Sequence, residues 1–323
     1  MASFAIGVIL SLTAAVGWGS AMVIFKVGVK DVDFLAAGYI RGLIVIPFLI
    51  SLGFIFDGIT TYAKLMTYPN ILWVLLGALF LGLGDVFSLL ALQKIDVSIS
   101  QPITAIYPIF TTLTLLIAKI EDITWFIIGG TLLITAGVII ISYFSQKNEM
   151  NNNDEISSQE SELKDEKPKR RVPAGILISI IAAFFWGVAI VFNRVILEDP
   201  SIEVIPLMGL RNGLMVVGIA LFVFIRFFTN REKYAKKIFA PKKEVFLLMG
   251  GGLISWCVGG VSFFTAVSMI GAGVTTPISS ISPLVVLILG TIFLKEKLTI
   301  PKAIGILIII LGSIVLAIPE MLS

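Results

Sequence analysis

The amino-acid sequence predicts an all-α membrane protein, with ten transmembrane helices arranged as two inverted five-helix repeats. Three observations support this fold class: the composition, uncharged runs long enough to cross a bilayer, and an internal repeat. Of the 323 residues, 57% are hydrophobic and 14% are charged, whereas an ordinary soluble domain has about 25% charged residues. Runs such as 4–25 and 97–118 contain no charge and could each span the bilayer core. We therefore expect lipid to surround most of the chain.

Apolar runs bounded by charged residues, Pro or Gly predict the ten spans. The first run lacks the flanks of a cleavable signal peptide, so we interpret it as a span. The uncharged run 245–294 would be roughly 75 Å long as one helix, so it must fold back, and the Gly-Ala-Gly sequence at 271–273 is the expected break. The predicted spans are 4–25, 34–54, 71–92, 97–118, 123–143, 174–196, 204–225, 245–268, 272–294 and 302–318.

Residues 146–172 separate the two predicted repeat domains, 1–145 and 173–323. This segment is rich in Asn, Ser, Glu and Lys and has no apolar periodicity, which predicts a disordered linker. The basic run 167–171 at its end fits a topology signal before the next span, or alternatively a contact with anionic lipid.

An internal repeat relates the two halves of the sequence. At a shift of 175 positions, the Gln-Pro-Ile motif at 101–103 aligns with Thr-Pro-Ile at 276–278, and a shift of 168 aligns Trp18 with Trp186. Each half has five predicted spans, an odd number, so the second half enters the membrane from the opposite side. Such an inverted repeat predicts alternating access, in which a site at the midplane opens first to one side and then to the other.

Both repeats contain a motif set that resembles the EamA-type drug/metabolite transporters over nearly the whole chain apart from the linker. The first repeat has Ala-Val-Gly-Trp-Gly-Ser at 15–20 and departs from the family at Lys-Ile-Glu, 119–121, where Gly-Glu is common. The resemblance implies a ten-helix fold and export or uptake of small solutes. Members carry amino acids, sugars, nucleotides, drugs or lipid-linked sugars, so the substrate stays open. The shared positions are Pro102, Pro108, Glu121, Gly130 and Gly137 in the first repeat and Pro277, Pro283, Glu296, Gly305 and Gly312 in the second.

Polar residues at helical spacing mark one face of the fourth and ninth predicted spans. Because the two sets coincide under the 175 shift, we expect them to face one another across a central cavity and to bind substrate. Alternatively, small polar residues pack and hydrogen-bond between membrane helices. The candidates are Ser100, Thr104, Tyr107 and Thr111 in the fourth span, and Thr275, Ser279 and Ser282 in the ninth.

Three charged residues lie inside predicted spans. Asp85 would be protonated, pair with Arg41 or Arg211, or face water, and each arrangement could couple it to a proton or a cationic substrate. A structural salt bridge is the alternative. The two arginines could bind a carboxylate or phosphate, but we favour a structural role, with stems that snorkel to the interface.

Aromatic residues at matching mid-span positions are candidates for cavity walls. Trp18 and Trp186 align in the repeat, and Tyr107 and Trp256 join them as wall candidates; ordinary packing explains them equally well.

Four charged residues at span ends are expected to have structural roles or to be solvated. Lys26 and Arg194 would complement helix dipoles first and act as gate residues second. Glu121 and Glu296 are expected to be solvated in loops.

The sequence favours a transporter over other function classes. With one cysteine, Cys257, and no histidine, it predicts no disulfide, metal site, catalytic residue or cofactor. We interpret the chain as a secondary transporter that moves a small metabolite, an amino-acid-like or related solute, across the cell membrane by alternating access, with export as one direction. The alternatives are a flippase for a lipid-linked sugar, an intramembrane enzyme, for which a catalytic constellation is lacking, and a channel, which needs polar faces on more helices.

The expected partners are the substrate, membrane lipids and a coupling proton, without nucleic acid, and the chain is expected to be a monomer or weak dimer.

The distribution of basic residues predicts the orientation in the cell (inner) membrane. Of the 24 Lys and Arg residues, Arg41 and Arg211 lie in spans, and Lys64, Lys119 and Arg194 lie on the side of the termini. The other 19 lie on the opposite side, which includes the linker. The positive-inside rule therefore predicts a cytoplasmic linker and external termini, although many members of the resembling family keep both termini in the cytoplasm.

Overall fold

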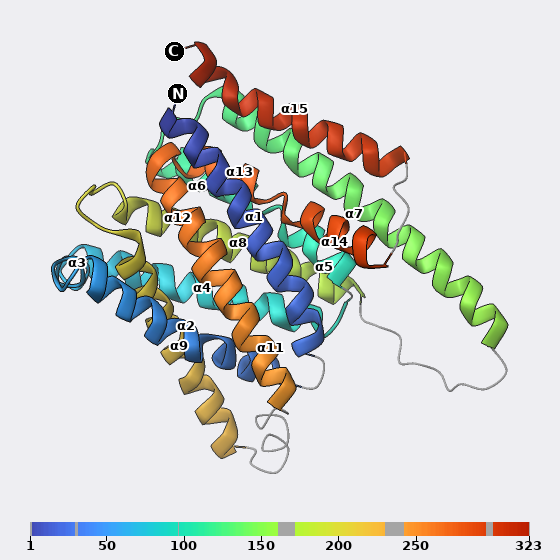
Figure 1. The fold of residues 1–323 in the computed structure, drawn as a ribbon, viewed down its shortest axis with the longest axis horizontal. Helices are drawn as coiled ribbons and strands as arrows, with labels where there is room; N and C mark the ends of the chain where they lie inside the picture. The colour runs from blue at the N-terminus through green and yellow to red at the C-terminus, as the bar shows by residue number, and fades with distance from the viewer. Residues whose placement is uncertain are drawn as a thin grey trace.

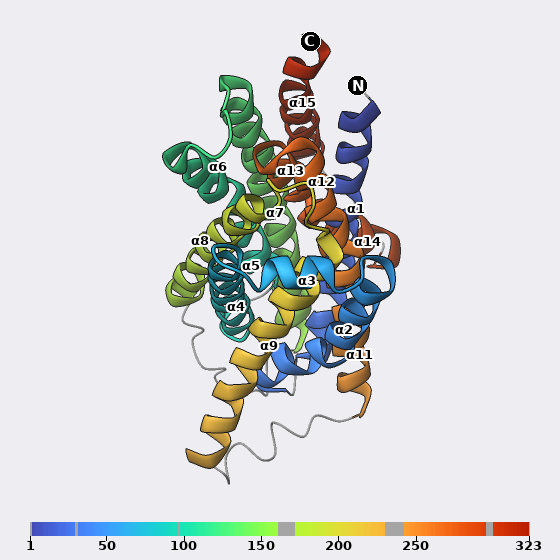
Figure 2. The ribbon, with the colours of Figure 1, turned by 90° about the vertical axis from the view of Figure 1, so that its left-hand side faces the viewer.

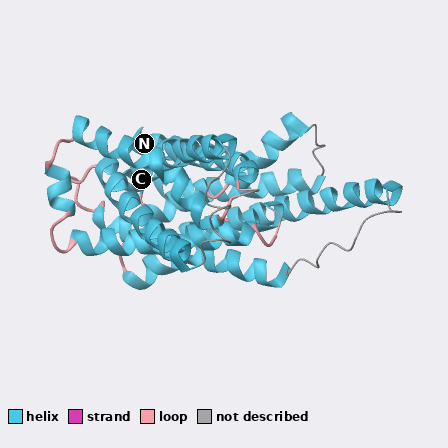
Figure 3. Ribbon diagram, turned by 90° about the horizontal axis from the view of Figure 1, so that it is seen from below, coloured by secondary structure: helices cyan, strands magenta, loops and turns pink. Residues whose placement is uncertain are grey.

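The computed structural model describes residues 2–29, 32–95, 97–160, 172–229, 242–294 and 300–322. Within these ranges the secondary structure is helical, without strands (Figure 3). Six helices are long and apolar enough to cross a membrane, and four shorter apolar helices complete ten spans in this part of the chain. The predicted fold class of ten helices is thus confirmed. Both termini lie at one end of the helix bundle (Figure 1).

The five spans of each repeat follow in the same order. In the first repeat they are α1 (Ala2–Gly28), α2 (Phe34–Phe56), α4 (Asn70–Leu92), the pair α5 (Val97–Thr104) and α6 (Tyr107–Ala118), and α7 (Trp125–Glu160). In the second they are α8 (Val172–Ile196), α9 (Val204–Thr229), the continuous run α11 (Lys242–Leu253), η1 (Ile254–Gly260) and α12 (Val261–Ile270), the pair α13 (Ala272–Ser279) and α14 (Ser282–Leu294), and α15 (Ile300–Leu322). A short helix α3 (Thr60–Leu65) joins α2 to α4; its six residues are too few to show a period in the sequence.

The fourth and ninth spans are broken helices, which corrects the expectation of one continuous face in each. The break falls at 105–106 in the first repeat and at 280–281 in the second, and these positions coincide under the 175 shift. Pro108 and Pro283 each stand at the second residue of the following half-helix. Proline lacks the N–H that would continue the preceding turn and restricts the residue before it, so both helices restart there.

The eighth span contains a π-helical segment, η1, between α11 and α12. The wider π turn is uncommon in proteins and is frequent near functional sites. Here it carries Ser255 and Trp256 on its buried side.

Helix α7 continues to Glu160, so its last turns lie within residues 146–172, which the sequence predicts as a disordered linker. The stretch from 138 to 167 contains neither Gly nor Pro, so nothing in the sequence forces the helix to stop there. Residues 161–171 of the predicted linker lie outside the described residues.

Helix α15 packs against the first part of α7, and the last part of α7 extends beyond it (Figures 1 and 2). A Cβ atom added to Gly137 would lie 2.7 Å from the carbonyl oxygen of Gly305, and one added to Gly312 would lie 3.0 Å from that of Gly130. Gly130 and Gly137 of α7 align with Gly305 and Gly312 of α15 in the repeat, so the two helices contribute equivalent surfaces to this contact. Glycine is needed because the two backbones approach this closely.

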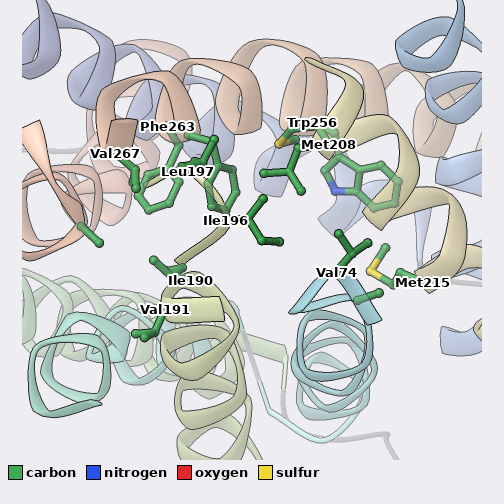
Figure 4. Packing of buried hydrophobic residues seen from close by; sticks show 14 of the residues in the cluster. Val74, Ile190, Val191, Ile196, Leu197, Met208, Met215, Trp256, Phe263 and Val267 are labelled. Carbon is green, nitrogen blue, oxygen red and sulfur yellow. The ribbon is translucent and has the colours of Figure 1, made fainter. Parts of the chain in front are cut away.

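The apolar residues divide between the outside and the centre of the bundle. Large side chains such as Phe56, Leu221 and Phe228 are exposed, as expected for helices that face lipid. In the centre, Ile190 of α8, Met208 of α9 and Phe263 of α12 converge in one buried cluster (Figure 4). The second repeat thereby supplies much of the wall around the site described next.

Candidate functional site

A cavity of about 150 Å³ lies between the two repeats. Its wall is mostly apolar and aromatic, with a small number of polar and charged groups, as in most small-molecule sites. Both repeats contribute to it. The structure places nine of the residues singled out from the sequence on this wall: Trp18, Arg41, Asp85, Thr104, Tyr107, Trp186, Arg211, Trp256 and Ser282.

The remaining polar candidates are buried nearby and do not line the cavity. Ser100 Oγ hydrogen-bonds Ser179 Oγ at 3.0 Å, and Thr275 is fully buried on α13. Ser279 Oγ lies 3.1 Å from the Tyr107 hydroxyl. Thr111 Oγ1 donates to the carbonyl oxygen of Gly187 at 3.1 Å. The structure therefore brings the two predicted sets together at Tyr107 and Ser279, while Ser100, Thr111 and Thr275 pack between helices.

Arg41 and Asp85 form a buried ion pair at the cavity wall. Asp85 Oδ1 also accepts a 3.0 Å hydrogen bond from Trp186 Nε1. The Arg41 guanidinium carbon lies 5.4 Å from the ring centre of Phe25 and 5.2 Å from that of Trp256. The expectation that Arg41 snorkels to the interface is therefore wrong, because its charge is stabilised inside the protein by a carboxylate and two rings.

Arg211 is also buried at the wall, with 2% of its surface exposed, so snorkelling is wrong for this residue too. Its Nε and Nη2 atoms donate to Asn212 Oδ1 at 3.2 and 2.9 Å, and its guanidinium carbon lies 4.6 Å from the ring centre of Phe264. Among the described residues it forms no ion pair at salt-bridge distance.

The two repeat-related tryptophans occupy equivalent places. Trp18 Nε1 donates to the backbone carbonyl oxygen of Ser255 at 3.0 Å, and Trp186 Nε1 donates to the side-chain carboxylate of Asp85. Each ring packs where the facing helix has a glycine, Gly259 for Trp18 and Gly84 for Trp186. A side chain at either glycine would collide with the indole, so this position fixes where each ring stands.

Glu121 links the two repeats on the face where the termini lie. One carboxylate oxygen pairs with Arg194 at the end of α8, and the two oxygens accept hydrogen bonds from the backbone N–H groups of Ala272 at 2.7 Å and Gly273 at 2.9 Å. The expectation of a solvated loop residue is wrong for Glu121, because it caps the N-terminus of α13. Gly271, with φ of 79°, lets the chain turn tightly enough for this approach.

Of the other two charged residues at span ends, Glu296 lies outside the described residues, and only the backbone of Lys26 is described.

A second cavity, of about 560 Å³, lies on the same face as Glu121 and is walled by the α8–α9 connection and α12. Glu198, Asp199 and Glu203 at its edge are exposed, and hydrogen bonds from Ser201 lower the pKa of Asp199. Water screens such charges, so we assign no site here.

The sequence reasoning missed three polar residues of the central wall. Gln101, Asn212 and Ser255 all line the cavity. Gln101 stands in the Gln-Pro-Ile motif that aligns with Thr-Pro-Ile at 276–278, and Asn212 follows Arg211 inside an apolar span, so both carried a usable signal. Ser255 depends on the π-helical segment, which the sequence does not reveal.

Comparison with known proteins places the chain in a family. The profile of the EamA-like transporter family matches residues 5–143 and again 173–318. The chain belongs to this family. An EamA-like protein of this kind is a multi-pass membrane transporter and not an enzyme, and the family resemblance drawn from the sequence is confirmed.

One relative matches nearly the whole of this EamA-like chain, and another matches less than half of it. An uncharacterized transporter of Archaeoglobus fulgidus is 23% identical over 318 residues, which cover 97% of this chain and 99% of the relative. An uncharacterized protein of Methanocaldococcus jannaschii is 30% identical over 145 residues, covering 44% of this chain but 96% of that protein. The second relative is thus about as long as one repeat.

A solved crystal structure shares the fold. It covers 97% of both chains with a TM-score of 0.68 at 16% sequence identity. At this identity the similarity concerns the fold alone.

Proposed function

We propose that this EamA-like transporter moves a small, amino-acid-like metabolite across the cell membrane by alternating access. The observation that carries the proposal is the central cavity, which is walled by both inverted repeats. Two halves of similar structure can exchange conformations, so that a site between them opens to each side in turn.

The size and lining of the cavity support a small substrate. A cavity of about 150 Å³ takes a ligand of roughly benzene size, or about six to ten non-hydrogen atoms. Many amino acids and their derivatives are this large. A lipid-linked sugar is much larger, so the cavity favours a metabolite transporter over a flippase.

The Glu121 cluster supports a closed state on the side of the termini. The carboxylate holds the end of α8 and the start of α13 against the connection between α6 and α7. Opening on this side would separate these elements, and the charge of Glu121 would then lose its three partners. The cluster therefore acts as a latch in the proposed cycle.

Cysteine labelling tests alternating access. Thr104→Cys in a Cys257→Ala background places one thiol at the cavity wall, and Tyr68→Cys, at an 82% exposed position, is the control for sidedness. In right-side-out and inside-out vesicles we expect an impermeant thiol reagent to reach Thr104→Cys from both sides and Tyr68→Cys from one. Adding Glu121→Ala should increase labelling from the side of the termini. Labelling of the cavity thiol from one side only, with and without Glu121→Ala, would contradict the proposal.

Asp85 is proposed as the coupling residue. It is the only carboxylate among the described residues of the central wall, and its protonation would release Arg41. In proteoliposomes, uptake of radiolabelled leucine or 4-methyl-2-oxopentanoate should follow an imposed proton gradient in the wild type and not in Asp85→Asn. Gradient-driven uptake by Asp85→Asn would refute coupling at this residue.

The proposed membrane is the cell (inner) membrane, with residues 146–172 in the cytoplasm and both termini outside. The support is the excess of Lys and Arg on the linker side. Single cysteines at Ser158 and Ser323 in the Cys257→Ala background test it in intact cells. We expect an impermeant reagent to label Ser323→Cys only, and labelling of Ser158→Cys alone would reverse the orientation.

A further inference from the structure

We infer that the substrate is a monocarboxylate with a compact apolar body, and that its carboxylate binds Arg211 and Asn212. This inference rests on the proposed transport function and specifies the chemical class that the cavity would take.

The charges on the described cavity wall do not balance. They are two guanidinium groups, Arg41 and Arg211, and one carboxylate, Asp85. Both oxygens of Asp85 are engaged, Oδ2 by Arg41 and Oδ1 by Trp186. Asp85 still attracts Arg211 electrostatically, but one positive charge is left over. A buried charge without a close partner is unfavourable, and a bound monoanion would neutralise it.

The Arg211 guanidinium is held by the protein and has one nitrogen without an acceptor. Phe264 lies over its face, Asn212 Oδ1 accepts hydrogen bonds from Nε and Nη2, and Met208 Sδ accepts one from Nη2 at 3.4 Å. Nη1 has no acceptor among the described residues. Because the planar guanidinium binds carboxylates through its N–H edge, a ring on its face leaves that binding mode available.

The other unsatisfied polar atoms of the described wall are also donors. Arg41 Nε, Gln101 Nε2 and Asn212 Nδ2 are buried without an acceptor, as Arg211 Nη1 is. The orientation of the Asn212 amide is fixed, since its oxygen faces two guanidinium N–H groups. Buried donors without an acceptor favour a ligand that supplies acceptors, and a carboxylate does so without adding donors.

The same wall disfavours a zwitterion. A zwitterion adds no net charge, so it would leave the surplus positive charge of the wall in place. Around Arg211 the wall is apolar, with Met208, Phe263 and Phe264, which suits an aliphatic or aromatic body. A branched 2-oxo acid therefore fits better than the amino acid of the same shape.

Binding to purified full-length protein in detergent tests the inference. The probes are 4-methyl-2-oxopentanoate, leucine as its near-isostere with an ammonium group, 3-methylbutylamine without a carboxylate, and inorganic phosphate. We expect the oxo acid to raise the melting temperature most, leucine less, and the amine not at all. Stabilisation by phosphate equal to that by the oxo acid would show an unspecific anion site and overturn the monocarboxylate assignment.

Variants connect the binding to Arg211. Arg211→Gln should weaken oxo-acid binding about ten- to hundredfold, and Arg211→Lys should retain part of it. Asn212→Asp is a near-isosteric change that gives Arg211 an internal carboxylate, so it should fold and lose the oxo acid. Lys64→Gln removes one positive charge outside the cavity and is the matched control. Unchanged affinity in a folded Asn212→Asp protein would overturn the inference.

The two proposals fail separately. If the cavity thiol is labelled from both sides but none of the probes binds, alternating access stands and the substrate assignment is wrong. If the oxo acid binds through Arg211 but the thiol is reached from one side only, the assignment stands and transport by alternating access is wrong.

Discussion

On the cavity wall, the two repeats share their backbone features and a buried arginine and differ in one carboxylate. Each has a tryptophan that packs on a glycine of the facing helix and a fourth helix broken before a proline. Yet the position of Asp85 in the first repeat is Gly260 in the second, and both line the cavity. The duplicated features are those that the inverted fold requires twice. The carboxylate of Asp85 is present in the first repeat alone, so the wall of the cavity is asymmetric.

Replacing Asp85 with Ala should have the largest effect, since it makes the first repeat as uncharged as the second at this position. Arg41 would remain buried without its partner, which costs about 3–5 kcal/mol. We expect a corresponding loss in the free energy of unfolding, measured in detergent. Asp85→Asn should lose less, because the amide oxygen can still accept a hydrogen bond. Glu198→Ala, which removes an exposed carboxylate, is the control, and equal stability of all three variants would contradict the buried ion pair.

The shared glycines allow a second test of the comparison. Gly137→Leu places a side chain against the backbone of Gly305 on α15, and such overpacking costs about 1–3 kcal/mol. Gly312→Leu, its partner in the α7–α15 contact, should lose a similar amount. Gly218→Leu is the matched control, since no atom lies within 4 Å of an added Cβ there. Thermal unfolding of the three variants measures the difference. A stable Gly137→Leu protein would show that the two helices can move apart at little cost.

The latch at Glu121 should have a smaller effect. Glu121→Gln keeps the shape of the side chain and removes the charge that faces Arg194 and the N-terminus of α13. Helix-end charges and caps contribute about 0.5–2 kcal/mol, so we expect a loss of about 1 kcal/mol and more labelling of Thr104→Cys from the side of the termini. The neighbouring Asp122→Asn changes an exposed carboxylate and is the control. Identical labelling in both variants would mean that Glu121 caps α13 without latching the repeats.

The sequence predicted the fold better than the contacts of the site. Composition and the repeat were enough for ten helices, because lipid imposes span length and the repeat imposes inversion. The helix breaks were missed although Pro108 and Pro283 marked them, since an apolar run hides a short non-helical segment. Pairing of Arg41 with Asp85, 44 residues away, was one of the alternatives that the sequence offered. Glu121 was assigned to solvent because its partner Ala272 is 151 residues away. Such contacts depend on how the helices pack, which cannot be predicted from one residue and its neighbours in the sequence.

The Tyr107 hydroxyl allows the finest test of the contact between the two polar sets. It lies 3.1 Å from Ser279 Oγ and 3.4 Å from the Thr276 carbonyl oxygen, so it joins α6 of one repeat to α13 of the other. Tyr107→Phe removes this link and keeps the ring. The cost should be about 0.6 kcal/mol, the average for hydrogen bonds between membrane helices.

The loss is expected to be small because neither partner is left unsatisfied. Ser279 Oγ also donates within α13, with the carbonyl oxygens of Thr275 at 2.9 Å and Thr276 at 3.1 Å, and the Thr276 oxygen accepts from the backbone N–H of Ser280 at 3.0 Å. A double-mutant cycle of Tyr107→Phe with Ser279→Ala isolates the pair, and Tyr143→Phe, on the exposed side of α7, is the control. A coupling energy above about 2 kcal/mol would mean that this single contact, and not the packed glycines, holds the two repeats in register.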